Sequence, residues 1–209
     1  MHIIMDNRIK ELISKGFEAL DDGEISYSPK DVDTAIKAFQ EVLTLDPCHE
    51  VAWYQLYSIY LSEKKDMQTA RHVLENVYAL NPKDFKVLSI LGGHFQSEEV
   101  DLEKSDYYFD LLLLYYPDKP ETYSTVGCYL LTRDHERAIK MLYHAIELDE
   151  TFINPYITLV SEYKQSHDYK TAYAIAMQGL EKGVEVAGRA NKSSLRYHLN
   201  EIEKNLKNL

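Results

Sequence analysis

The sequence predicts an all-α protein, a solenoid of about five antiparallel helical hairpins with a C-terminal capping helix. In segment 53–82, apolar residues recur at the three- and four-residue spacing of a helix face on both sides of the short polar break 62–66. A small residue then recurs at steps of 33 to 35 residues, at Ala35, Ala70, Ser105, Ala138 and Ala172. A single hairpin of this kind has one solvent-exposed face and cannot bury its own apolar surface. We therefore expect copies of the hairpin to stack on one another.

Further packing positions repeat with the same period. The large position of each first helix holds Trp53, Leu88, Tyr123 and Tyr156, and the position three residues later holds Leu56, Leu91, Val126 and Leu159. The next position of the first helix is a glycine in two repeats, Gly92 and Gly127. In two other repeats the same position holds Tyr57 and Val160. Prolines at 47, 82 and 117 end second helices, because proline lacks the N–H and disfavours helical geometry in the residue before it.

From about Ile9 to Gly183, this pattern resembles the tetratricopeptide repeat (TPR) family, whose period is about 34 residues. The resemblance implies a right-handed superhelix whose first helices line a concave groove. It also implies that extended peptides or helices of partner proteins bind in that groove. The resemblance is specific for the fold and nearly silent on the partner, because the family is defined by its packing residues.

We expect one array of five repeats followed by a cap. The repeats are placed at about 6–47, 48–82, 83–117, 118–150 and 151–184, within a domain of residues 1–188. The cap is residues 189–209, whose amphipathic face is marked by Ser193, Leu195, Leu199, Ile202 and Leu206. A terminal helix with a polar outer side closes the open end of a solenoid.

The first repeat is irregular. Its first helix is expected from Asp6 to Asp21, and its second from Thr34 to Leu45 with Asp31 or Asp33 as the cap. The connection 23–33 is about seven residues longer than the turn of the family. It is either a tolerated surface insertion or a partner contact at the end of the solenoid. The natural start could be Met1 or Met5, and the sequence does not decide between them.

The third repeat carries two unusual features. Its first helix contains the pair Gly92-Gly93, which lowers helix propensity, and Gly93 is expected to face the groove. Its connection is strongly acidic, with Glu98, Glu99 and Asp101 among its carboxylates. Negative residues near a helix N-terminus stabilise the helix dipole, which explains about half of them. The spacing of a calcium loop is not present.

Charge and composition limit the classes of partner that the protein can be expected to bind. The net charge is −11, and residues 1–180 carry 17 Lys and Arg against 30 Asp and Glu. Because nucleic acids and anionic lipids are bound through Lys and Arg, neither is expected as a partner. No apolar run reaches the ~18 residues of a membrane helix, and the start does not read as a signal peptide. Cys48 and Cys128 fall two repeats apart, too far for a disulfide, so we expect a cytoplasmic protein.

The sequence contains no motif that is typical of a catalytic, metal or cofactor site. Eight histidines are scattered without an H-E-x-x-H pattern, and the two cysteines do not pair with a histidine at zinc spacing. A glycine-rich phosphate loop and a nucleophile elbow are also missing. We therefore expect no catalytic residues, no metal and no cofactor, and we expect a binding protein rather than an enzyme.

The family resemblance selects the groove positions. They are Tyr54, Ser58, Lys86, Ser89, Gly93, Gln96, Ser124, Cys128, Asn154, Ser161 and Lys164. Some TPR proteins clamp the C-terminal carboxylate of a chaperone with groove Lys, Asn and Arg side chains, and that clamp is not found here. The small residues instead favour close approach of a chain by backbone contacts, with Tyr54 as an aromatic wall.

A second surface is expected on the outside of repeat three. Tyr107, Leu111 and Leu114 share one stripe of its second helix, at i, i+4 and i+7, where the other repeats are mostly polar or small. Tyr143 of the next repeat would extend the patch. Either the stripe is exposed and forms a self-association or partner surface, or the acidic connection or irregular stacking covers it.

These patterns predict a non-enzymatic protein-protein interaction module, an adaptor or scaffold that binds a protein segment in its groove. One alternative is a dedicated chaperone or assembly factor for one partner. Another is a peptide-sensing regulator or an accessory subunit of an enzyme complex. The partner is a protein or peptide in each case, and the sequence does not identify it.

Overall fold

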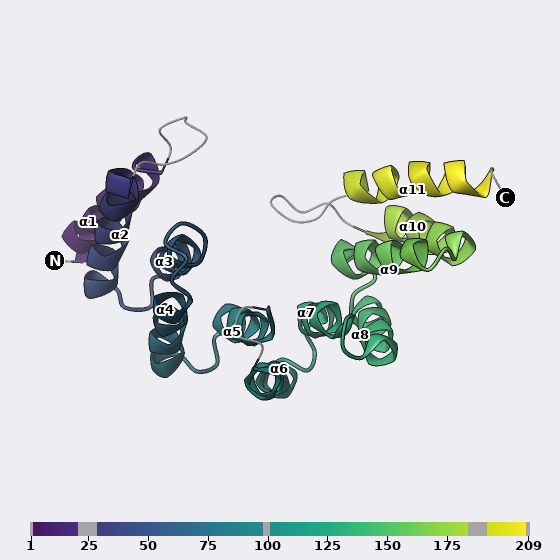
Figure 1. Cartoon of the computed structure of the whole chain (residues 1–209), viewed down its shortest axis with the longest axis horizontal. Helices are drawn as coiled ribbons and strands as arrows, with labels where there is room; N and C mark the ends of the chain where they lie inside the picture. The colour runs from purple at the N-terminus through teal and green to yellow at the C-terminus, as the bar shows by residue number, and fades with distance from the viewer. Residues whose placement is uncertain (1, 21–28, 98–100, 184–191, 208–209) are drawn as a thin grey trace. The chain divides into compact units, whose positions relative to one another are not determined.

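The computed structural model of the chain describes residues 2–20, 29–97, 101–183 and 192–207. Within these residues it contains eleven α-helices and no strand, so the all-α prediction is confirmed (Figure 1). The helices are α1 (His2–Glu18), α2 (Pro29–Leu45), α3 (Glu50–Ser62), α4 (Met67–Leu80), α5 (Phe85–Ser97), α6 (Leu102–Tyr115), α7 (Pro120–Leu130), α8 (His135–Leu148), α9 (Ile153–Gln165), α10 (Tyr169–Lys182) and α11 (Lys192–Leu206).

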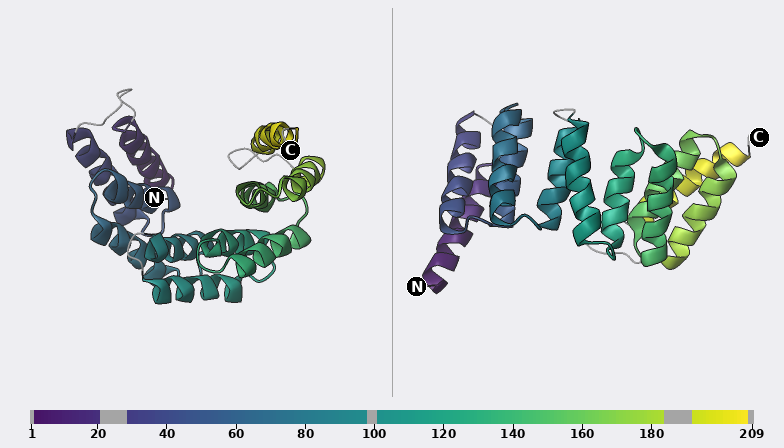
Figure 2. Two further views of the ribbon diagram at one scale, coloured as in Figure 1. Left: turned by 45° about the vertical axis from the view of Figure 1, so that its right-hand side comes forward. Right: turned by 90° about the horizontal axis from the view of Figure 1, so that it is seen from below.

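The chain divides into two compact units, Met1–Tyr108 and Phe109–Leu209, with the boundary inside α6. In the first unit α1 packs on α2, α2 on α3, α3 on α4 and α4 on α5. In the second unit α7 packs on α8, α8 on α9 and α9 on α10, and α11 packs on both α9 and α10. Each unit is therefore a stack of helical hairpins, as the turned views also show (Figure 2).

The periodic small residues occupy the close contacts between helices, as predicted. All five, Ala35, Ala70, Ser105, Ala138 and Ala172, are fully buried. Ser105 is tolerated there because its hydroxyl donates a hydrogen bond of 2.9 Å to the carbonyl oxygen of Gly92. A buried hydroxyl without a partner would cost free energy, so this bond explains the one polar member of the series.

Each unit has its own apolar core. In the first unit Leu12, Phe39 and Leu56 are buried in one cluster to which α1, α2 and α3 all contribute. In the second unit Leu142 and Tyr156 are fully buried with two residues of α11, Leu195 and Ile202. The amphipathic face expected of the last helix is therefore packed against the preceding hairpin.

The first repeat differs from its prediction. Helix α1 runs from His2 to Glu18 instead of from Asp6 to Asp21, and α2 begins at Pro29 instead of Thr34. Proline suits a helix start because its missing N–H would have no helical partner there. The caps expected at Asp31 and Asp33 are wrong, since Asp31 lies in the first turn of α2 and Asp33 lies further inside. Most of the connection 23–33 lies outside the described residues, as do Glu98 and Glu99.

An aspartate caps four of the second helices. Asp66, Asp101, Asp134 and Asp168 each accept a hydrogen bond of 3.0 to 3.1 Å from the backbone N–H three residues later. A side-chain oxygen at this position satisfies an N–H that the helix leaves without a partner. In two of them a threonine adds a second bond, from Thr69 to Asp66 at 2.6 Å and from Thr171 to Asp168 at 2.7 Å.

We expect Asp168→Ala to lower the melting temperature by about 2–4 °C at neutral pH, because the first turn of α10 loses its cap. Hydrogen bonds from the side chain and then the backbone of Thr171 lower the pKa of Asp168. Its contribution to stability is thus present above the unfolded pKa and is lost as the pH falls through the folded pKa. Thermal unfolding followed by circular dichroism from pH 7 to pH 2.5 measures both effects.

Two variants act as controls for this prediction. Asp168→Asn keeps an acceptor without a charge, so it should retain most of the neutral-pH stability and lose the acid dependence of this site. Glu181→Ala removes an exposed carboxylate of the same helix and should change neither quantity. Equal melting temperatures for Asp168→Ala and Glu181→Ala would contradict the capping role.

Candidate functional site

The face of the first helices in the first unit offers the largest cluster of predicted groove residues. We call Val51, Tyr54, Ser58, Lys86 and Ser89 the Tyr54 surface. Tyr54 of α3 is 40% exposed and Val51 beside it is 38% exposed. Lys86 reaches over from α5, so that its ammonium lies 4.7 Å from the centre of the Tyr54 ring and 2.6 Å from the carboxylate of Glu50. An aromatic side chain, an aliphatic side chain and a cation thus share one exposed surface.

The two serines of this surface are small side chains. Ser58 and Ser89 are half-buried, and the Ser89 hydroxyl donates a hydrogen bond of 2.7 Å to the carbonyl oxygen of Phe85. Gln96 is also half-buried. Gly93, by contrast, is buried and does not offer the open surface expected of it. A residue without a side chain exposes only its backbone, which neighbouring side chains cover easily.

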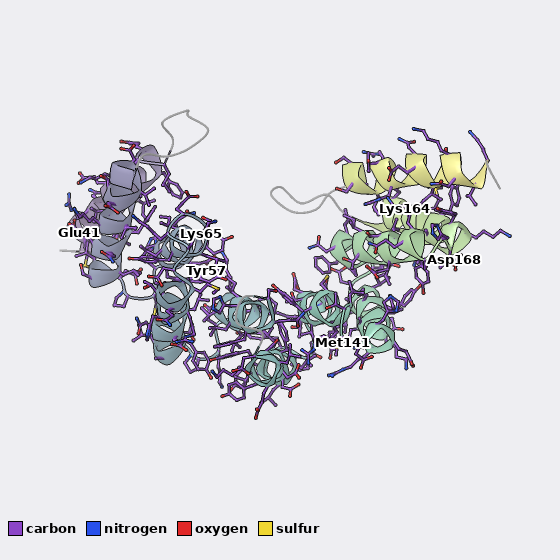
Figure 3. The ribbon with its side chains drawn as sticks, in the orientation of Figure 1. Glu41, Tyr57, Lys65, Met141, Lys164 and Asp168 are labelled. Carbon is purple, nitrogen blue, oxygen red and sulfur yellow. The ribbon has the colours of Figure 1, made fainter. Side chains whose placement is uncertain are left out.

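Tyr57 and His94 connect α3 to α5 beneath this face. His94 is 1% exposed, and its Nδ1 lies 3.4 Å from the Tyr57 hydroxyl, with the two rings in edge contact. Figure 3 shows Tyr57 among the side chains of α3. Tyr57 stands where the third and fourth repeats have Gly92 and Gly127, and its larger side chain reaches the next hairpin. These contacts join α3, which carries Tyr54, to α5, which carries Lys86.

In the second unit, most of the predicted groove residues are buried or half-buried. Cys128 of α7 is exposed, with its Sγ 3.5 Å from the Thr158 hydroxyl of α9. Desolvation raises the pKa of the Cys128 thiol, which disfavours the reactive thiolate form. Ser124 is buried, so its side chain does not lie on the open surface expected of it. Asn154 and Ser161 are half-buried.

Lys164 is already engaged within the chain. Its ammonium lies 2.5 Å from the carboxylate of Glu201 and 3.1 Å from Nδ1 of His198, both on α11. Figure 3 labels Lys164 next to this helix. The hydrogen bond from Lys164 lowers the pKa of Glu201, whereas burial and then the Lys164 charge lower the pKa of His198. Lys164 thus connects α9 to the capping helix. Its side chain is not open to a ligand in the way the sequence predicted.

Ion pairs between residues about one repeat length apart were not predicted from the sequence. Lys86 pairs with Glu50, 36 residues earlier, and Lys164 pairs with Glu201, 37 residues later. Arg8 pairs with Glu41 across 33 residues at 2.8 Å. Opposite charges separated by roughly the repeat length are a signal that a search of the sequence could have found.

The outer stripe of repeat three is largely exposed. Tyr107 is 53% exposed and Leu114 is 67% exposed, while Leu111 is half-buried. The Tyr107 hydroxyl lies 3.3 Å from that of Tyr78. Tyr143 lies on α8 and its hydroxyl donates a hydrogen bond of 3.4 Å to Tyr163 of α9. Burial and the bond to Tyr163 raise the pKa of Tyr143 above its ordinary value.

No set of three His, Cys, Asp or Glu side chains converges on a possible metal position within the described ranges. Among those same residues, no helix combines the length and the apolar character needed to cross a membrane. Cys48 and Cys128 are free thiols, and both are exposed.

Comparisons with known proteins identify similar folds. No protein-family model matches the chain. A segment of 120 residues is 32% identical to the anaphase-promoting complex subunit CDC27 of Saccharomyces cerevisiae. That segment covers 57% of this chain and 14% of CDC27, so the chain spans a small part of its curated relative.

Several solved structures match over nearly the whole chain, among them the following two. A TPR protein of Thermus thermophilus, TTC0263, has a TM-score of 0.59 and 18% identity over 96% of this chain and 99% of its own. The type IV pilus biogenesis factor PilW has a TM-score of 0.62 and 14% identity over 98% of this chain and 88% of its own. At these identities the similarity shows the fold alone, and that fold is the tetratricopeptide repeat.

Proposed function

We propose, from the tetratricopeptide-repeat fold of the chain, that it is a non-enzymatic adaptor or scaffold that binds an extended segment of a partner protein on the face of its first helices. TPR proteins are protein-protein interaction modules. The observation that carries the proposal for this chain is the Tyr54 surface. There an exposed tyrosine, an exposed valine and a lysine share one face with two small serines.

This surface suits a peptide for physical reasons. Tyrosine presents a large contact area at a low entropic cost and is enriched at protein interfaces. The half-buried Ser58 and Ser89 let a backbone approach, and Lys86 can turn from Glu50 to a carboxylate of the ligand without leaving the aromatic ring. In the second unit Ser124 and Lys164 add little, so we place the main contacts on the first unit.

One alternative role is supported by a comparison. CDC27 is a subunit of the anaphase-promoting complex, and the segment similar to it covers 57% of this chain. We therefore keep, as the second candidate, an accessory subunit or assembly factor that holds one dedicated partner. The two exposed free cysteines fit the reducing, cytoplasmic setting proposed for either role.

The experiment that tests the proposal is a quantitative pull-down from the native lysate with matched variants. Ser58→Arg places a long charged side chain on the Tyr54 surface and Tyr54→Ala removes its aromatic contact. We expect each to reduce recovery of the partner at least about tenfold. Asn76→Arg adds the same side chain to an exposed position of α4 and should leave recovery unchanged. Circular dichroism checks that all three variants remain folded.

The outcomes separate the candidate functions. A partner that is lost with the Tyr54 variants but not with Asn76→Arg supports binding on this surface. Aggregation of one stoichiometric partner in the absence of the chain favours the assembly factor, and a melting temperature that rises with short peptides favours a sensor. Equal recovery by all variants excludes the Tyr54 surface as the binding site. Turnover by the purified chain would contradict every binding role.

A further inference from the structure

We infer that α6 carries a second docking surface, which fits a basic amphipathic helix of a partner protein. We call Tyr107, Leu111 and Leu114, with the flanking Glu103 and Asp110, the α6 seam. All five residues lie on this one helix. The surface is separate from the Tyr54 surface, and its occupant is inferred from the pattern of apolar and acidic side chains.

Two of the three apolar residues of the seam lie mostly outside the buried side of α6. The helix buries Ser105, Phe109 and Leu112, which are at most 2% exposed. Tyr107 and Leu114 remain 53% and 67% exposed on another side of the helix. Tyr107 contacts the Tyr108 ring edge-on and its hydroxyl lies 3.3 Å from that of Tyr78, but more than half of its surface stays in water. Large apolar side chains that stay exposed in this way are typical of a contact surface.

The other second helices show that the fold does not require apolar residues at these positions. The corresponding residues are Lys37, Glu41 and Thr44 in α2, His72, Asn76 and Ala79 in α4, Lys140, His144 and Glu147 in α8, and Ala174, Gln178 and Glu181 in α10. They are polar or small throughout. The apolar seam is therefore a local property of α6 and not a feature of the repeat.

The spacing of the seam matches one side of a short helix pair. Its apolar residues are separated by four and then three residues, which is the alternation of a coiled-coil contact. In such a contact, the residues that flank the apolar positions determine which partner pairs with the helix. Helix α6 has 14 residues and a length of about 21 Å, enough for two heptads of contact.

The flank of the seam is acidic. Glu103 and Asp110 stand seven residues apart and are exposed. The nearby Lys104 is drawn away from the seam, because its ammonium pairs with Asp101 at 3.1 Å and lies 4.9 Å from the centre of the Phe95 ring. A partner helix with Lys or Arg beside its own apolar stripe would complement these charges.

The same charges argue against a second copy of the chain as the occupant. Two copies that paired through the seam would each contribute the same flanking carboxylates, and the one basic residue of α6, Lys104, is already paired with Asp101. Each copy also carries a net charge of −11. Like charges brought together lower affinity, so the acidic flank disfavours self-pairing and selects a basic partner.

The test uses the full chain and two designed helical peptides of the same length. Both carry leucine at the seam-facing positions, and one has lysine and the other glutamate at the flanking positions. In fluorescence anisotropy, we expect the lysine peptide to bind at least about tenfold more tightly than the glutamate peptide. This preference should weaken as the salt concentration rises.

Variants separate the seam from general attraction to an acidic protein. Leu114→Asp should reduce binding of the lysine peptide about tenfold or more with an unchanged helical signal. The double variant Glu103→Lys with Asp110→Lys should shift the preference toward the glutamate peptide. Glu147→Lys with Glu181→Lys makes the same change of charge on α8 and α10 and should leave the preference as it is, as should Tyr54→Ala.

Three results would overturn the inference. The first is that neither peptide binds. The second is that the control double variant changes the preference as much as the seam double variant does, which would mean that only net charge matters. The third is a wild-type dimer in light scattering that Leu114→Asp converts to a monomer, since the occupant would then be a second copy.

Discussion

A chain that ends at Gly188, and so lacks α11, is expected to lose much of the stability of its second unit and to associate. Leu195 and Ile202 of this helix are both 0% exposed and pack in a cluster with Tyr156 and Ile175. Loss of a buried Leu or Ile side chain costs about 2–5 kcal/mol, and whole domains are stable by only about 5–15 kcal/mol. The truncation also uncovers the apolar partners of both residues.

Thermal unfolding and light scattering measure this result. The double variant Leu195→Ala with Ile202→Ala keeps the helix in place and should reproduce most of the loss of stability. Tyr197→Ala changes a 62% exposed residue of the same helix and should have little effect. A truncated chain that remains monomeric with an unchanged melting temperature would show that α11 is not a cap.

Gly179→Leu is expected to destabilise the second unit by about 3 kcal/mol or more. A Cβ atom at Gly179 would lie 2.8 Å from Cδ1 of Leu195 and 2.9 Å from Cβ and Cγ of Tyr156. Such distances are too short for carbon atoms, so α9 and α11 would both have to move, and the larger leucine adds further strain. Overpacking of this kind typically costs about 1–3 kcal/mol, occasionally more.

Gly127→Ala is the matched comparison for this prediction. Its added Cβ would lie 3.1 Å from Cγ of Leu142 and 3.2 Å from the carbonyl oxygen of Ala138, a tighter contact than usual but not a clash. The gain in helix propensity of up to about 1 kcal/mol offsets that strain. Urea unfolding should therefore place Gly127→Ala near the wild type and Gly179→Leu far below it. Similar midpoints for the two variants would contradict the packing described for α9, α10 and α11.

The fold could be predicted from the sequence because its signals are periodic. Ala70 and its four counterparts, together with the apolar first-helix positions, report contacts that every repeat makes, and all five small residues are buried as expected. Prediction failed where the pattern is broken. The start of α2 at Pro29 was missed because the following acidic residues, Asp31 and Asp33, resemble a cap.

The candidate site was less predictable than the fold. A repeat position tells which way a side chain points in an average hairpin, and three of the residues chosen in this way, Tyr54, Lys86 and Cys128, are exposed. The repeat position does not tell which residues of neighbouring helices a side chain contacts. Ser124 is buried by its own surroundings, and Lys164 is taken by Glu201 of the last helix, a contact outside the repeat pattern. The division into five repeats of one array and the partner-binding roles of these residues stay predictions.

The packing of each helix on its neighbours in sequence has a consequence for how the chain folds. Within each unit the contacts join α1 to α2, α2 to α3 and so on, or α7 to α8 and α8 to α9, and only short stretches of chain separate the partners. Closing short loops loses little entropy, and proteins dominated by local contacts fold in microseconds to milliseconds. A hairpin such as α3 with α4 can therefore begin to bury Trp53 and Leu74 while the ribosome is still synthesising the later helices.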